Sequence, residues 1–166
     1  MHLVKMTALS AAIAFGAAGG IAIGQQAGGP PVRQVAPTDR AADFTLAELE
    51  ATFKEMDAGK IPTMRLIEGG RYNVNIRRLV GSESALVHPK TADVWVVREG
   101  SGTLVTGGTL VDGRTNANGD LSGSAISGGV ERTIKTGDVV FIPAGVPHGV
   151  KQSQSITWLN IRFDTK

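Results

Sequence analysis

The chain offers imidazole chemistry at two positions beyond its N-terminal region, His88 and His148. A histidine side chain can bind a metal ion or move a proton near neutral pH. His148 ends the segment GDVVFIPAGVPH, residues 137–148, in which a Gly-Asp turn and an apolar strand precede a short bend. Pro143 and Gly145 can bend the chain at the end of that strand, so these residue types favour a fixed direction for His148.

Two groups of polar side chains alternate with apolar ones, as they do on one face of a β-strand. They are Asn73, Asn75 and Arg77 in one segment, and Trp158, Asn160 and Arg162 in the other. On an ordinary strand such a stripe faces solvent, whereas in a barrel with a cavity it can face inward and orient an anionic or hydroxylated ligand. Strand parity alone leaves both arrangements open.

The segments that carry these side chains are expected to be β-strands. Short apolar or alternating runs separated by Gly-bearing turns predict strands at residues 64–67, 72–80, 94–97, 102–106, 131–134, 139–142 and 156–163. So many short strands indicate an all-β sandwich or barrel. The glycine- and asparagine-rich segment 112–129 is expected to be a solvated hairpin loop, with a calcium loop through Asp112 and Asp120 as the weaker alternative.

One short helix is expected near the N-terminus, at residues 44–56. Thr45 and Glu48 have the spacing of a capping box, and Phe44 and Leu49 that of a hydrophobic staple. Four apolar side chains share one face of this helix and should pack against the strands: Leu46, Leu49, Phe53 and Met56.

The first 24 residues have the outline of a signal peptide, because His2 and Lys5 precede a long uncharged run rich in Ala and Gly. Residues 25–42 are expected to be a flexible linker without function, and residues 43–166 a single domain. We therefore expect an exported protein, periplasmic or secreted, with no stable membrane insertion after processing. The 17 basic residues are interleaved with 15 acidic ones, which argues against a nucleic-acid partner.

Residues 137–148 closely resemble the second motif of the cupin superfamily, which has Gly, Pro, Gly and His at the spacing found here. The segment 86–102 is similar to a degenerate first motif, counted back from Gly100. It has Asp93 where the family has Glu, and Leu86 where the family has the first of two His. The resemblance covers residues 72–163 and implies an antiparallel jelly-roll β-barrel, often dimeric, with a metal ion inside.

Carried over to this chain, the resemblance implies that His88, Asp93 and His148 hold a divalent ion such as Fe, Mn, Ni or Zn. The side chain of Asp93 is one methylene shorter than that of Glu, which counts against its reaching the ion. The alternative is that Asp93 and Lys90 form a solvated pair at the start of a strand. If the polar stripes face inward, the side chains that would contact a small-molecule substrate are Asn75, Trp95, Trp158 and Asn160. Tyr72 and Arg77 are the candidates for catalytic residues.

Three functional hypotheses follow. The first is a metal-dependent enzyme acting on a small organic molecule as a dioxygenase, isomerase or lyase. The second is a metal-free epimerase that uses a His–carboxylate pair as base and Tyr72 as acid. The third is a binding module that captures a metabolite or sugar without turnover, which the loss of a His at Leu86 would favour.

Overall fold

The computed structural model describes residues 29–165, so the expected signal peptide and residues 25–28 of the expected linker lie outside the described part. Within residues 29–165, one helix, α1 (Leu46–Gly59), accompanies twelve strands. The strands are β1 (Val32–Val35), β2 (Thr63–Glu68), β3 (Tyr72–Gly81), β4 (Ala85–Val87), β5 (Thr91–Thr106), β6 (Thr109–Val111), β7 (Arg114–Thr115), β8 (Leu121–Gly123), β9 (Ala125–Ser127), β10 (Val130–Lys135), β11 (Val139–Ile142) and β12 (His148–Asp164). All the predicted strand segments are confirmed.

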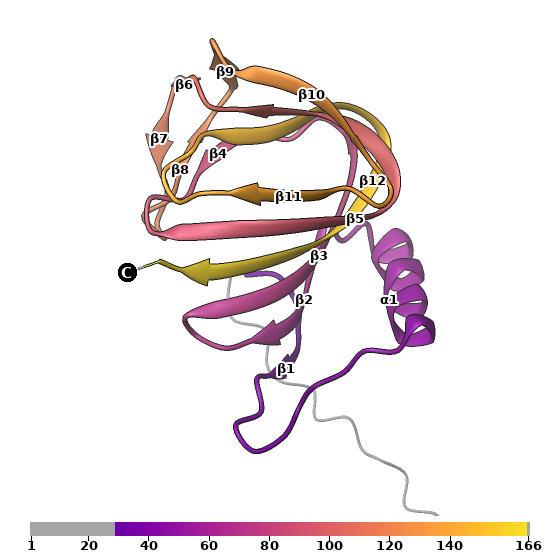
Figure 1. Ribbon diagram of the computed structural model, residues 1–166. Coiled ribbons are helices and arrows are strands. Elements are labelled where there is room, and N and C mark those ends of the chain that lie inside the picture. Colours follow the sequence, from indigo (N-terminus) through magenta and orange to yellow (C-terminus); the bar gives the residue numbers. More distant parts are fainter. Residues whose placement is uncertain (1–28, 166) are drawn as a thin grey trace, which may run out of the picture.

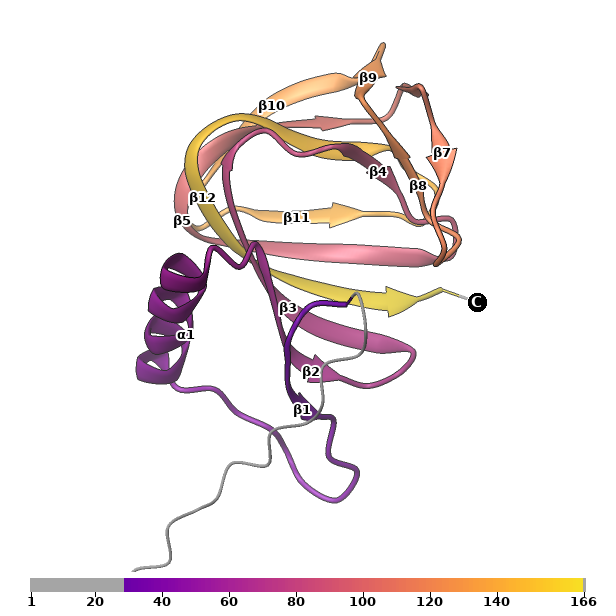
Figure 2. The ribbon, with the colours of Figure 1, turned by 180° about the vertical axis from the view of Figure 1, so that it is seen from behind.

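Two long antiparallel strands, β5 and β12, pair with each other along most of their length and bend over to form the barrel (Figures 1 and 2). Along its other edge, β5 pairs with β11 in its first half and with β10 in its second half. On the other edge of β12, the sheet is extended by β3, β2 and β1, in that order. The two predicted strands at 94–97 and 102–106 are therefore halves of β5, which continues through the intervening turn residues.

Gly100 makes the bend in β5 possible. Its φ is +72°, and a Cβ at this position would lie 1.9 Å from the backbone oxygen of Ser155 on the paired strand. Only a residue without a side chain fits both conditions. This is the glycine from which the first motif was counted, and its place in the motif thus has a steric cause.

The helix covers the outer face of the sheet formed by β2 and β3 (Figure 1). Its capping box is confirmed, because the Thr45 amide donates to Glu48 Oε2 over 2.8 Å and Thr45 Oγ1 accepts from the Glu48 amide over 3.3 Å. The helix side chains that pack on the strands are Leu49, Phe53 and Met56. Leu46 was wrongly expected on this face, and is 60% exposed.

The covering helix decides which way the polar stripes point. Apolar alternates such as Ile76 and Leu159 pack toward α1, so Asn75, Arg77 and Asn160 must face the barrel interior. A second apolar cluster, separate from the one beneath α1, shares the barrel interior with these polar side chains, and it contains Trp95, Trp158 and Ile142. The inward arrangement of the stripes is therefore the correct one.

The expected linker contains a strand that was not predicted, whereas the expected hairpin at residues 112–129 is present and is also joined to the barrel by strand pairing. Within residues 25–42, the expected linker, Val32–Val35 form β1, which pairs in parallel with β2. Within residues 112–129, the expected loop contains β7, β8 and β9, and β8 pairs with β4. Strands of two to four residues show too little periodicity to be recognised, and their pairing partners are remote in sequence.

No helix within residues 29–165 is long and apolar enough to cross a membrane.

Candidate metal centre

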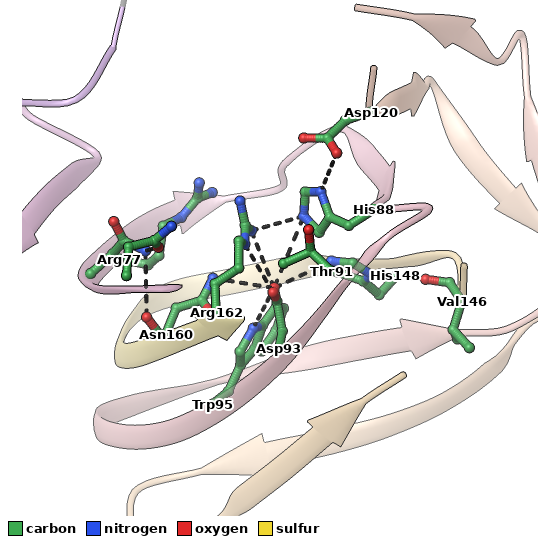
Figure 3. A network of polar contacts seen from close by, with 12 residues as sticks. Arg77, His88, Thr91, Asp93, Trp95, Asp120, Val146, His148, Asn160 and Arg162 are labelled. Atoms are coloured by element: carbon green, nitrogen blue, oxygen red, sulfur yellow. Dashed lines mark hydrogen bonds and ion pairs between the residues drawn. The ribbon is translucent and has the colours of Figure 1, made fainter. Parts of the chain in front are cut away.

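Three strands bring His88, Asp93 and His148 together inside the barrel (Figure 3). Asp93 lies near the start of β5, His148 begins β12, and His88 directly follows β4. All three side chains are buried, and one potential ligand atom from each lies within 4.8 Å of the others. Asp93 is only 1% exposed, so the alternative of a solvated pair with Lys90 is wrong.

His148 offers an unprotonated nitrogen to this cluster. Its Nδ1 lies 2.9 Å from the carbonyl oxygen of Val146, which can only accept, so Nδ1 carries the proton. Its Nε2 lies 3.9 Å from Asp93 Oδ2. Burial lowers the pKa of His148 to about 4, and the ring is therefore neutral at pH 7 with the Nε2 lone pair free.

Asp93 is an ionised carboxylate held by several donors. Arg162 donates to it twice, from Nε to Oδ1 over 2.9 Å and from Nη2 to Oδ2 over 3.2 Å. The side-chain nitrogens of Trp95 and Asn160 each donate to Oδ2 over 3.3 Å. Burial opposes the charged form, but the hydrogen bonds and charge of Arg162 outweigh it and hold the pKa of Asp93 below its ordinary value.

His88 lies between Arg162 and Asp120. Arg162 Nη2 lies 2.8 Å from His88 Nε2, and because a guanidinium can only donate, Nε2 is the acceptor and Nδ1 carries the proton. That Nδ1 lies 3.0 Å from Asp120 Oδ1, a close contact that is not aligned as a hydrogen bond. Asp120 belongs to the turn between β7 and β8, where its amide and that of Asn118 donate to Asn116 Oδ1.

The donor set suits a transition-metal ion. Two neutral imidazoles present Nε2 toward one carboxylate, and in proteins such rings are usually fixed through the other nitrogen by a carbonyl or carboxylate. Val146 and Asp120 occupy those outer positions. Two sets of contacts oppose metal binding. The hydrogen bond of Arg162 to His88 Nε2 is one that a bound ion would replace, and the donors of Arg162, Trp95 and Asn160 already occupy the Asp93 oxygens.

Trp95 forms an aromatic wall of the cluster, as expected for a residue sharing the inward face with Asp93. Its ring lies edge-on to His148 with 5.7 Å between centroids, and stacks at a tilt on Trp158 with 4.9 Å between centroids. Both tryptophans are almost completely buried and belong to the apolar core. Trp158 contacts both Trp95 and Arg77, and Arg77 lines a neighbouring pocket.

A pocket of about 430 Å³ lies next to the cluster and is lined by Asn75, Arg77, Asn160 and Arg162. Arg77 is thus separate from the three candidate ligands. It pairs with Glu83, and its guanidinium carbon lies 5.6 Å from the centre of the Trp158 ring.

The structure does not bring Tyr72 to the site. Tyr72 is 47% exposed and shares the outer face of β3 with Val74 and Ile76, which pack toward α1. Tyr72 is consequently wrongly placed to act as the acid that the epimerase hypothesis requires.

Two residues that contact the candidate metal ligands were not predicted from the sequence as site residues. Arg162 was recognised only as part of a polar stripe, and its position two residues beyond Asn160 was the available signal. Asp120 was considered only for calcium, and lies instead against His88. Nothing in the local sequence indicates that contact, since it depends on how the β7–β8 turn folds over the barrel.

No protein-family model matches the sequence, and no curated protein matches it either. Among solved structures, the chain is similar to a protein of Bacillus halodurans, with 15% identity, 78% of this chain and 84% of that chain covered, and a TM-score of 0.51. It is also similar to a protein with a double-stranded β-helix domain from Klebsiella pneumoniae, at 16% identity, 61% and 74% coverage and a TM-score of 0.45. A cupin 2 conserved barrel domain protein from Salinispora arenicola has 15% identity, 62% and 75% coverage and a TM-score of 0.43.

The first of these likenesses extends over most of both chains and shows a shared fold. The jelly-roll barrel is the fold that the resemblance to cupins implied. Its first motif runs from β4 into β5, and its second runs through β11 and ends at His148, the first residue of β12. The resemblance predicted from residues 72–163 is confirmed at the level of the fold.

Proposed function

We propose that this chain is a metal-dependent enzyme of the cupin fold that binds one divalent ion through His88, Asp93 and His148 and acts on a small organic molecule. The observation that carries the proposal is a buried cluster in which Nε2 of His88 and Nε2 of His148 lie 4.0 Å and 3.9 Å from Asp93 Oδ2. Iron, manganese, nickel and zinc all accept this donor set.

When bound, such an ion supplies Lewis acidity and open positions for a substrate, which dioxygenase, isomerase and lyase reactions all use. The residues of the chain contribute the surroundings. Trp95 and Trp158 exclude water from one side of the cluster. Arg162 and Asn160 connect the cluster with the neighbouring pocket, because each touches Asp93 and also lines that pocket.

Elemental analysis of protein purified without chelator or histidine tag tests this function. We expect close to one transition-metal ion per chain, and its loss in His88→Ala and His148→Ala. Asp93→Asn should lose the metal as well, and Asp112→Asn is its matched control, because Asp112 pairs with Ser124 away from the cluster. Metal retained in both histidine variants would contradict the proposal.

A second candidate is a binding module that takes up a small molecule without metal. It is favoured by the contacts of Arg162, whose guanidinium already neutralises Asp93 and occupies His88 Nε2. Protein that stays free of metal after reloading, yet is stabilised by a small-molecule ligand, would support this candidate over the enzyme.

Export to the periplasm or medium and a homodimer are further parts of the proposal. N-terminal sequencing of the mature protein tests cleavage near residue 24. Light scattering tests the dimer through its mass.

A further inference from the structure

We propose that the pocket beside the metal cluster binds the carboxylate group of a small organic acid and directs the rest of that acid toward His88, Asp93 and His148. The inference rests on the proposed function for its catalytic meaning, because it names the substrate class of the same site. The binding itself requires no metal.

The charge on the pocket wall is the first argument. Three arginines line the pocket, Arg65, Arg77 and Arg162, and no acidic residue does so. Each arginine has one carboxylate partner, respectively Glu68, Glu83 and Asp93. None of those carboxylates lines the pocket, so the charged groups that face it are the guanidiniums.

The remaining hydrogen-bonding capacity of the arginines is the second argument. The three side chains are similarly placed, 21%, 24% and 23% exposed respectively. A guanidinium has five N–H donors in a planar fork that matches a carboxylate. Arg77 donates only from Nη2, Arg65 from Nε and Nη1, and Arg162 from Nε and Nη2, so each keeps at least one terminal nitrogen free of a partner within the described part of the chain. A partly buried setting also strengthens an ion pair relative to one in bulk water.

The strand register connects this pocket to the cluster. Arg65 pairs with Asn75, Asn75 with Asn160, and Asn160 with Trp95, so one row of side chains crosses β2, β3, β12 and β5 on the inner face. Asn160 also donates to Asp93 Oδ2. A ligand held at the arginines therefore has its other end beside the candidate metal ligands.

The rest of the lining favours an organic anion over an inorganic one. Pro30, Pro31, Ile61 and Pro62 form an apolar part of the wall, and Asn118 comes from the β7–β8 turn. Apolar side chains give an organic body something to contact, whereas phosphate would gain nothing from them. Residues 30 and 31 belong to the expected functionless linker, and here they help to enclose the pocket.

The test is ligand binding by the full protein after its metal has been removed. Acetate, lactate, malonate and succinate are titrated by calorimetry and thermal unfolding, each beside its neutral amide. We expect at least one acid to bind and raise the unfolding midpoint while its amide does neither. Equal effects of acid and amide, or no binding by any acid, would overturn the proposal.

Substitutions of the pocket arginines test whether the acid binds in this pocket. Arg65→Gln should weaken the binding of that acid at least tenfold, and Arg77→Lys should weaken it as well because the fork is lost. Arg132→Gln should leave it unchanged, since Arg132 is exposed and lines a different surface with Phe141. Unchanged affinity in Arg65→Gln and Arg77→Lys, or competition by inorganic phosphate at equal concentration, would overturn the assignment.

His148→Ala separates this proposal from the proposed function. The variant should lose metal and keep the carboxylate affinity. If the acid binds but no metal is retained by the native protein, the proposed function fails alone. If metal is retained but no acid binds, the carboxylate site fails alone.

Discussion

Arg162 donates a hydrogen bond from Nη2 to Nε2 of His88 over 2.8 Å, on the same nitrogen that faces Asp93 and His148. A metal ion and a guanidinium cannot both use that lone pair. The guanidinium and the ion therefore compete for one position, and metal loading must release Arg162 from His88. Arg162 lines the neighbouring pocket, which gives the released side chain a place to turn.

This competition predicts that Arg162→Gln raises the affinity for metal and lowers the stability of the metal-free protein. Metal affinity should rise about tenfold, because the competing donor and a nearby positive charge are removed. The metal-free protein should lose about 3 kcal/mol of unfolding free energy, because buried Asp93 loses its ion-pair partner. Metal titration and urea unfolding measure the two quantities, and a fall in metal affinity would show that Arg162 supports the site.

Asp120→Asn should weaken metal binding by about 10- to 100-fold, because it replaces the charged oxygen 3.0 Å from His88 Nδ1, which favours the protonated Nδ1 and a free Nε2, by a neutral amide. The free energy of unfolding of the metal-free protein should change little, since Asp120 is partly exposed at its turn. Competition with a chromophoric chelator measures the affinity. Asp112→Asn serves as the control, and equal affinities in the two variants would exclude Asp120 as a positioning residue.

Gly100→Ala should destabilise the fold severely, by about 3 kcal/mol or more, through positive φ and the collision with the Ser155 oxygen. Gly107→Ala shares the positive φ of +76° but meets nothing within 4 Å, so it should cost about 1 kcal/mol. Urea unfolding of both variants separates steric contact from backbone strain. Equal losses would mean that β5 does not bend at Gly100 as described.

Stability of the metal-free protein should fall as the pH is lowered from 6.5 to 4. The pKa of His148 is about 4 in the folded chain against an ordinary 6.5, so only the unfolded chain takes up the proton in this range. The loss is about 3 kcal/mol at most, and it levels off below pH 4 for this residue. Asp93 acts in the same direction at lower pH, because its folded pKa is also depressed.

Urea unfolding across this pH range, compared between the native protein and His148→Asn, measures the contribution of His148. The variant should show a shallower dependence on pH. Identical curves would mean that the buried ring is not neutral in the folded chain.

The second half of the fold was predictable because its signals are local. The turn, strand and bend before His148 lie within twelve residues, and the strand alternation around Asn75 and Asn160 is regular. The direction of that alternation was not predictable, since it depends on α1 covering one face of β2 and β3. The roles of Arg162 and Asp120 depend on contacts between remote segments, which periodicity does not encode.

The central claim, that His88, Asp93 and His148 hold one metal ion, is tested most directly by a crystal structure of zinc-loaded protein with anomalous scattering at the zinc edge. We predict one anomalous peak per chain, about 2.0–2.2 Å from a nitrogen of each histidine and from an Asp93 oxygen. Arg162 should then have left His88 Nε2. A fully loaded crystal with no peak among these residues, and with Arg162 still bonded to His88, would contradict the account.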